Sequence, residues 1–205
     1  MVDVSEHYFS VSPSSTENRG LIKCNLRGFP FEFLTSSGVF SHRRIDNGTR
    51  LLVEEMELPD AGRVLDIGCG YGALGIAAAR LKLKLEVWMT DINPRAVRLA
   101  EENATRNGVH NVIVKQGNLY SPVGDTMFAT VVTNPPISAG ITKVVEPMIT
   151  HAYRYLDPGG ALQLVVQSNK GGRILAEIIE ETFGEAQVLA RGSGYRVLKG
   201  EKKLR

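Results

Sequence analysis

The fold is decided by the stretch Val64-Leu65-Asp66-Ile67-Gly68-Cys69-Gly70-Tyr71-Gly72. It begins as a short apolar run, typical of a buried strand, and continues into a loop with glycine at every second position. The next residues, 73–81, are almost all apolar and predict a helix. Glycine has no Cβ, so a ligand can approach the main chain closely, and the helix start adds free N–H donors. The stretch therefore predicts a strand, a ligand-binding loop and a helix.

Strands and helices alternate along most of the chain, which predicts parallel βαβ units with helices on both faces of one sheet. The strand runs are Val64–Ile67, Leu85–Thr90, Asn111–Gln116 and Ala129–Thr133, with a fifth, Ala161–Gln167, after a turn at Asp157–Gly160. The helical runs are Ala73–Leu81, Pro94–Asn107, Ile141–Tyr155 and Gly172–Phe183. The sequence therefore predicts an α/β fold with a Rossmann-like, mostly parallel sheet.

The two ends of the chain depart from this alternation. The strand runs Ala186–Arg191 and Tyr195–Lys199 are separated by only three residues, too few for a crossover, so they must pair antiparallel. They bring the sheet to seven strands with one reversed. Near the N-terminus, Leu21–Phe33 predicts a small β-hairpin that turns at Gly28, followed by a loop over 35–48 and a helix over 49–57. We expect a single domain over 1–205, with the hairpin and a pocket-closing loop in 1–48 and the core in 49–205.

Composition fits a protein with one substantial hydrophobic core. The 205 residues are 43% hydrophobic and 22% charged, and the formal net charge of +2 is too small by itself to indicate a nucleic-acid partner. Cys24 and Cys69 form no C-x-x-C pair, which favours a reducing, cytoplasmic setting. No apolar run approaches the ~20 residues of a membrane-spanning helix. The four histidines lack ligand spacing, so no metal site is predicted.

Polar residues follow the strand runs at one edge of the predicted sheet, where open α/β sheets bind ligands. Asp66, Asp91, Asn118 and Asn134 stand at or just after the ends of the first four runs. The glycine loop also matches the dinucleotide fingerprint, with Asp91 about 20 residues further on, so a nicotinamide cofactor competes with S-adenosylmethionine (SAM). SAM is favoured because Asp66 would repel a pyrophosphate but suits a cationic sulfonium and ammonium. The reversed strand favours SAM as well.

The tetrapeptide Asn134-Pro135-Pro136-Ile137 follows the fourth strand run and is rich in hydrogen-bond acceptors. Proline has no backbone N–H, so two prolines remove two donors where the strand ends. The Asn134 side-chain oxygen and the nearby carbonyls are able to receive both hydrogens of a planar amino group, such as an exocyclic amine on a base. Taken alone, the motif also fits a strand terminator. Its position beside three other polar strand ends favours a holder of an amino nucleophile.

Three motifs together resemble the class I SAM-dependent methyltransferases: the stretch 64–72, Asp91-Ile92-Asn93 and Asn134-Pro135-Pro136-Ile137. Gly38-Val39-Phe40-Ser41, followed by Asp46, Gly48 and Thr49, is similar to the narrower "methyltransferase small" family, typified by the 16S ribosomal RNA guanine-N2 methyltransferase C. The ending 194–199 resembles compact archaeal members. The resemblance implies the sheet order 3-2-1-4-5-7-6 and methyl transfer to a nucleobase amine, guanine N2 in ribosomal RNA foremost, with transfer RNA as another partner.

The resemblance also implies roles for individual residues. The catalytic set that would hold the target amine is Asn134, Pro135 and Pro136. The cofactor set is Asp66, Gly68, Gly70 and Gly72 along the methionine part, Asp91 and Ile92 at the ribose, Asn118 and Leu119 at the adenine, and Thr49 on the N-terminal side. The substrate set is Phe40 and Ile137 near the base, with Arg43, Arg44 and Lys170 at the RNA phosphates.

Ile137 departs from the family pattern, because many amine methyltransferases place Phe or Tyr there to stack on the target. An aliphatic residue stacks less well, which shifts that role to Phe40 or points to a different acceptor. A protein glutamine methyltransferase, which usually carries Tyr at this position, is a second hypothesis. A non-catalytic partner subunit that keeps the fold is a third. The sequence leaves the oligomeric state open between monomer and homodimer.

Overall fold

The computed structural model describes residues 16–204 of the chain. Seven strands form one sheet in the order β5-β4-β3-β6-β7-β9-β8, and β9 runs antiparallel to both of its neighbours. This confirms the seven-stranded sheet with one reversed strand and its order. The strands of the sheet are β3 (Gly62–Ile67), β4 (Leu85–Asp91), β5 (Val112–Gln116), β6 (Phe128–Thr133), β7 (Leu156–Gln167), β8 (Gln187–Gly192) and β9 (Tyr195–Glu201).

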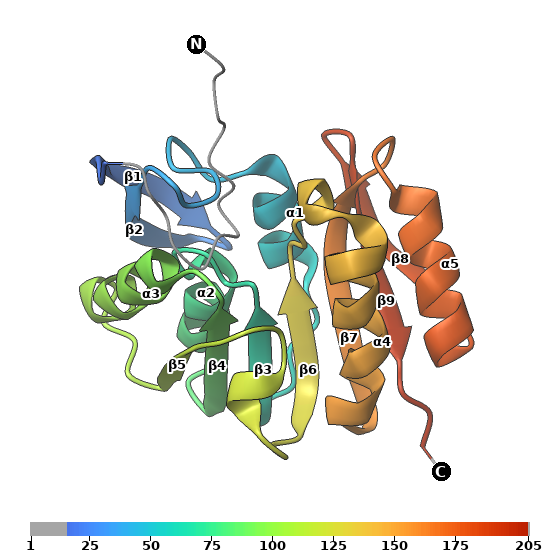
Figure 1. Cartoon of the computed structure of the whole chain (residues 1–205). Coiled ribbons are helices and arrows are strands. Elements are labelled where there is room, and N and C mark those ends of the chain that lie inside the picture. The colour runs from blue at the N-terminus through green and yellow to red at the C-terminus, as the bar shows by residue number, and fades with distance from the viewer. Residues whose placement is uncertain (1–15, 205) are drawn as a thin grey trace.

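Helices cover both faces of the sheet (Figure 1). One face carries α1 (Asn47–Glu55), α2 (Ala73–Leu81) and α3 (Pro94–Arg106), and the other carries α4 (Glu146–Tyr155) and α5 (Gly172–Phe183). Successive strand side chains point to opposite faces. In β3, Val64 accordingly belongs to the first core cluster and Leu65 to the second. The strands read as continuous apolar runs because both faces are buried.

The parallel strands all point to one edge of the sheet, the upper edge in Figure 1, and the hairpin of β1 (Arg19–Leu26) and β2 (Phe29–Ser36) lies at that edge. Two asparagine side chains one turn apart, Asn103 of α3 and Asn107 at its C-terminal cap, hold the free edge of β2. Asn103 exchanges hydrogen bonds with the backbone of Leu34, at 2.6 and 2.9 Å, and Asn107 with the backbone of Glu32, at 3.1 and 2.8 Å. The edge of the hairpin therefore keeps its backbone groups satisfied.

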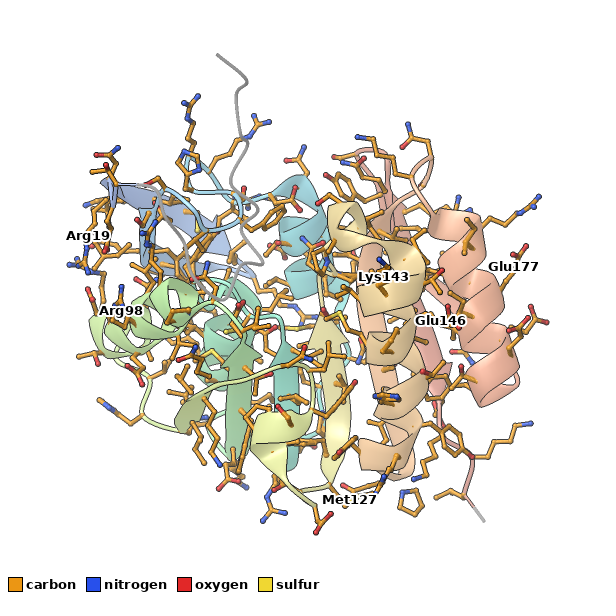
Figure 2. The ribbon with its side chains drawn as sticks, viewed as in Figure 1. Arg19, Arg98, Met127, Lys143, Glu146 and Glu177 are labelled. Carbon is orange, nitrogen blue, oxygen red and sulfur yellow. The ribbon has the colours of Figure 1, made fainter. Side chains whose placement is uncertain are left out.

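An ion pair and a buried aromatic layer add to this attachment. The Arg19 guanidinium makes two hydrogen bonds with the Glu102 carboxylate of α3, at 2.8 and 3.0 Å. Arg19 and Arg98 project together from this side of the molecule (Figure 2). Phe31 and Phe33 of β2 are buried in the same core cluster as α1, α2 and α3. The hairpin is thus a packed wall at the carboxyl edge of the sheet.

Helix α1 begins at Asn47, two residues before the expected start at residue 49. Asp46 explains the earlier start, because its Oδ2 accepts the backbone N–H of Thr49 at 3.0 Å. Such a cap satisfies one of the free donors of a helix N-terminus. The boundary expected between residues 48 and 49 therefore falls inside the first turn of a helix. Two short 3₁₀ turns, η1 (Ser121–Val123) and η2 (Ile137–Ala139), lie before and after β6 in the chain.

Two expectations differ from the structure. The turn expected over 157–160 lies inside β7, at a register shift against β6, where the Gly159 N–H and the Gly160 carbonyl pair with Lys202. The helix expected over 141–155 begins as a π-helical stretch, η3 (Ile141–Val145), and becomes α4 near Pro147, which occupies the first turn, where no N–H is needed. In residues 16–204, no helix is long and apolar enough to span a membrane.

Candidate functional site

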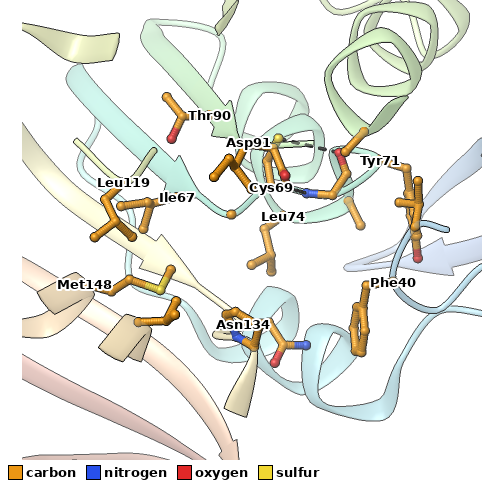
Figure 3. A pocket seen from close by; sticks show the side chains of 18 of the residues that line it. Phe40, Ile67, Cys69, Tyr71, Leu74, Thr90, Asp91, Leu119, Asn134 and Met148 are labelled. Atoms are coloured by element: carbon orange, nitrogen blue, oxygen red, sulfur yellow. Dashed lines mark hydrogen bonds between the residues drawn. The ribbon is translucent and has the colours of Figure 1, made fainter. Parts of the chain in front are cut away.

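A pocket lies at the carboxyl edge of the sheet, between the ends of β3, β4 and β6 and the loop that follows β2. Thr90 and Asp91 lie on one side of it, Asn134 and Phe40 lie on the other, and Leu74 lies between them (Figure 3). Its walls are formed by residues 39, 40, 49, 67–71, 73, 74, 90–92, 96, 117–119, 134, 136, 144 and 148. The pocket thus occupies the position at which open α/β sheets bind ligands.

Backbone hydrogen bonds fix the glycine loop at the end of β3. The N–H groups of Gly68 and Cys69 both donate to the Thr90 carbonyl, at 2.8 and 3.0 Å. Gly70 has a φ of +57°, and a Cβ built on it would have no atom within 4 Å. The space beside Gly70 is therefore open, and a ligand can lie directly against this main chain.

Main-chain donors hold Asp91 at the end of β4. The Gly70 N–H donates to its Oδ2 and the Asn93 N–H to its Oδ1, each at 2.8 Å. Burial raises the pKa of Asp91, and these backbone N–H groups oppose the rise. A carboxylate oxygen accepts more than one hydrogen bond, so both oxygens retain capacity for a ligand. The arrangement suits a pair of neighbouring hydroxyl groups.

Asp66 does not line the pocket, contrary to expectation. Its side chain is fully buried under α2, where Oδ2 accepts the Gly75 N–H at 2.8 Å. Burial raises the pKa of Asp66 to about 7, and the charge of Asp91 adds to the rise. Its Oδ1 has no hydrogen-bond partner among the described residues. Asp66 is therefore a buried residue beneath α2 and not part of the pocket wall.

Two partners at the start of α1 fix the side-chain amide of Asn134. Its Nδ2 donates to Asp46 Oδ2 and to Thr49 Oγ1, each at 3.0 Å. A carboxylate can only accept hydrogen bonds, so the nitrogen of the Asn134 amide must face Asp46, and the amide oxygen occupies the other terminal position of the side chain. Asn134 lines the pocket, so this fixed amide is part of the pocket wall.

The prolines after Asn134 shape the same wall. Pro136 lines the pocket, whereas Pro135 and Ile137 do not. The Pro135 carbonyl accepts the Ile137 N–H at 2.9 Å and, with two lone pairs, keeps room for a second donor. The Ile137 side chain packs against the second core cluster, which accounts for an aliphatic residue at this position.

The loop after β2 is attached to the side of the pocket that carries Asp91. Asn93 Nδ2 donates to the Gly38 carbonyl at 2.9 Å, and Arg95 Nη1 donates to the Ser37 carbonyl at 2.6 Å. Phe40 follows these contacts in the chain and lines the pocket. The loop ends at Asp46, which contacts Asn134 across the pocket wall. One short segment therefore joins both sides of the site.

Most of the predicted site residues meet at this pocket. Those that line it are Phe40, Thr49, Gly68, Gly70, Asp91, Ile92, Asn118, Leu119, Asn134 and Pro136. Besides Asp66, Pro135 and Ile137, those outside its walls are Gly72, which caps α2, and the exposed Arg43, Arg44 and Lys170. Sequence reasoning missed the apolar wall of Val144 and Met148, which no local pattern marks. The described residues contain no group of three or more His, Cys, Asp or Glu side chains arranged for a metal ion.

The sequence profile of the methyltransferase small domain matches residues 30–199. The chain belongs to the methyltransferase small domain family. Among its relatives, the uncharacterized protein YbxB of Bacillus subtilis is 40% identical over 97% of this chain and 100% of that protein. The ribosomal RNA small subunit methyltransferase C of Ectopseudomonas mendocina is 30% identical over 84% of this chain and 52% of that protein. The chain thus spans about half the length of the methyltransferase C proteins that it matches.

Solved structures share the fold. The Thermus thermophilus 16S rRNA N2 G1207 methyltransferase, in complex with AdoMet and guanosine, is 27% identical, with a TM-score of 0.81 over 94% of this chain and 52% of that chain. The ribosomal protein L11 methylase of Lactobacillus delbrueckii, 23% identical with a TM-score of 0.62 over 75% of this chain and 77% of that chain, shares the fold. Membership in the methyltransferase small domain family makes this chain a SAM-dependent methyltransferase with a Rossmann-like fold.

Proposed function

We propose that this chain transfers a methyl group from SAM to an exocyclic amino nitrogen of a nucleobase, with guanine N2 in ribosomal RNA as the first candidate. The observation that carries the proposal is the fixed amide of Asn134, across the pocket from Asp91. The Thermus relative, solved in complex with AdoMet and guanosine, aligns with 94% of this chain. This similarity supports SAM as the cofactor and guanine as the target base. The names of the methyltransferase C relatives support ribosomal RNA as the substrate.

The residues of the pocket fit SAM. Open space beside Gly70 gives the amino-acid part of the cofactor access to the main chain. Asp91 would accept the two ribose hydroxyls, and Asn118 and Leu119 would border the adenine. Thr49 would border the cofactor from the N-terminal side. When bound, SAM supplies an electrophilic methyl group on a sulfonium ion.

The chain itself would align the acceptor amine and turn its lone pair outward. An aryl amine is a poor nucleophile because its lone pair is delocalised into the ring. Hydrogen bonds from its N–H groups to Asn134 Oδ1 and to a main-chain carbonyl of the Asn134-Pro135-Pro136 segment would localise that lone pair and stabilise the positive charge that develops on nitrogen. Alignment of the two reacting atoms supplies much of the acceleration. The surplus proton leaves the amine after the transfer.

Phe40 would cover the target base. It lines the pocket, whereas Ile137, at the position where related enzymes carry an aromatic residue, packs into the core. Stacking of a base on an aromatic side chain is worth about 1 to 3 kcal/mol. A base in a duplex cannot reach such a pocket, so the target nucleotide would be unpaired or turned out of its helix.

Exposed basic side chains on three segments beside the pocket would contact RNA phosphates. They are Arg43 and Arg44 in the loop after β2, Lys143 in η3 next to the pocket residue Val144, and Lys170 after β7 (Figure 2 labels Lys143). Within residues 16–204, none of the four forms an ion pair, so their charges are available to a phosphate backbone. For RNA binding, these basic side chains beside the pocket would matter more than the small net charge of the whole chain.

The proposal is tested with radiolabelled SAM and separate fractions of ribosomal RNA, transfer RNA, DNA and protein, followed by digestion of the labelled fraction to monomers. We expect the label in RNA, as N2-methylguanosine, and we expect it to disappear with Asn134→Ala. Label on a protein glutamine would show that the acceptor is a carboxamide nitrogen and not a nucleobase amine. Binding of SAM without transfer to any fraction would support a non-catalytic partner subunit.

A further inference from the structure

One hydroxyl group of the C-terminal hairpin reaches the target side of the pocket. Tyr195, the first residue of β9, donates its O–H to Asp46 Oδ1 at 3.1 Å. The same hydroxyl oxygen accepts a hydrogen bond from Gln167 Nε2, at the end of β7, at 2.9 Å. A carboxylate carries no hydrogen, so the direction of the bond between Tyr195 and Asp46 is fixed. A strand near the end of the chain therefore contacts the residue that holds Asn134.

Asp46 connects this hydroxyl to the Asn134 amide. Its Oδ1 accepts from Tyr195, while its Oδ2 accepts the Thr49 N–H and an Asn134 Nδ2 hydrogen, each at 3.0 Å. The bond at Oδ1 opposes rotation of the carboxylate about its Cβ–Cγ bond. It thereby keeps Oδ2 directed at the Asn134 amide.

We propose that Tyr195 is a positioning residue for Asn134 and acts through Asp46. The inference rests on the proposed function, in which the Asn134 oxygen receives the target amine. Tyr195 does not line the pocket, so its hydroxyl acts on the reaction through Asp46 and not by contact with a substrate. The hairpin of β8 and β9 thus contributes to turnover as well as to the sheet.

Packing holds the Tyr195 ring in place independently of its hydroxyl. Gly48, in the first turn of α1, faces the ring so closely that a Cβ built on it would lie 2.7 Å from ring atoms Cδ1 and Cε1. Only glycine allows this approach of strand and helix. Burial raises the pKa of the Tyr195 phenol, so the hydroxyl keeps its proton at neutral pH. Tyr195→Phe therefore removes the hydrogen bonds and preserves the packing.

The kinetic test compares Tyr195→Phe with Tyr153→Phe, which removes a hydroxyl from α4, where the ring packs on Phe183. We expect Tyr195→Phe to lower kcat on RNA roughly tenfold, the size of one net hydrogen bond. The Kd of SAM and the KM of RNA should stay within about twofold, and Tyr153→Phe should keep the parent kcat. In a double-mutant cycle, Tyr195→Phe should add nothing to Asp46→Ala. A parent-like kcat for Tyr195→Phe, or additive effects in the cycle, overturns the proposal.

A second measurement does not depend on activity. The side-chain NH₂ resonances of Asn134, assigned by their loss in Asn134→Ala, report the two hydrogen bonds to Asp46 and Thr49. We expect Tyr195→Phe to shift these resonances and to speed their hydrogen exchange, whereas Tyr153→Phe leaves them unchanged. Unchanged resonances in Tyr195→Phe overturn the positioning role even where methyl transfer is observed. Absence of methyl transfer by the parent chain overturns the proposed function, and the resonances still decide the role of Tyr195.

Discussion

The two sides of the pocket are held together by different parts of the chain. On the cofactor side, backbone N–H groups of Gly70 and Asn93 hold Asp91, and the more distant of the two lies 21 residues away. On the target side, the side chains of Asp46 and Thr49 hold Asn134 from 88 and 85 residues away. One side depends on local main-chain geometry, and the other depends on side chains from distant segments.

This difference determines how each side responds to substitution. Main-chain donors remain whatever the side chains are, so the cofactor side depends on glycine conformations and one carboxylate. On the target side, loss of one polar side chain removes a hydrogen bond from a half-buried partner. We therefore expect changes on the target side to lower turnover and changes on the cofactor side to lower SAM affinity.

The largest expected effect follows from Asn134→Ala. Removal of the amide deletes the acceptor that would stabilise the charge developing on the amine, which costs on the order of a hundredfold to a thousandfold in kcat. The Kd of SAM should stay within about threefold, because the amide would touch the amine and not the cofactor. Single-turnover kinetics and calorimetry measure the two quantities. Near-normal turnover in this variant would falsify the amine-holder role, and the two sides of the pocket would then not differ in function.

The second-largest expected effect is the contribution of Asp66 to the pH dependence of stability. Burial holds the pKa of Asp66 at about 7 in the folded chain, above its ordinary value of 3.8, so folding takes up a proton between these values. The free energy of unfolding therefore falls as the pH rises through this range and levels off above it. From about pH 5 to about pH 8 the loss is roughly 2 to 3 kcal/mol.

Asp66→Asn isolates this contribution. The amide stays neutral at every pH, and its oxygen can still accept the Gly75 N–H that now bonds to Asp66. Urea unfolding of both proteins across the range should show a steeper decline in the parent than in the variant. Parallel curves would mean that burial does not govern this carboxyl group.

Asp91→Ala should chiefly weaken SAM binding. The substitution removes both proposed acceptors of the ribose hydroxyls and frees the Gly70 and Asn93 N–H groups, now bonded to Asp91. Hydrogen bonds to a charged group are worth about 1.5 to 3 kcal/mol, so the Kd should rise about tenfold to a hundredfold. At saturating SAM, kcat should remain within a fewfold of the parent. Calorimetry measures the affinity, and an unchanged Kd would contradict the ribose assignment.

The sequence predicted the sheet because its signals are local. The glycine stretch, the apolar runs and the short gap before β9 each act over a few neighbouring residues, and α2 and α5 begin and end where expected. The predicted start of β7 was wrong, since Gly159 and Gly160 pair with the distant Lys202 instead of forming a free turn. A long-range pairing of this kind leaves no pattern in the local sequence.

The site divides in the same way. The wall formed by the glycine loop could be predicted because residues 68–71, 73 and 74, which are close together in the sequence, build much of it. The environment of Asn134 could not, because Asp46 and Tyr195 reach it only through the packing of α1 and β9. Asp66 was misplaced because its neighbours in sequence do not reveal that its side chain turns under α2. The roles of the pocket residues in binding and catalysis remain predictions.

The smallest effect tests whether the cofactor lies against the main chain at Gly70. Gly70→Ala and Gly28→Ala each place one methyl group in open space at a residue with positive φ, +57° and +81°. Both variants should therefore lose a similar stability, about 1 kcal/mol, from the strained conformation. Gly28 lies at the hairpin turn and outside the pocket walls, so only Gly70→Ala should weaken SAM binding, by several-fold. Thermal unfolding and calorimetry on the two variants separate strain from contact, and equal SAM affinities would place the cofactor away from this loop.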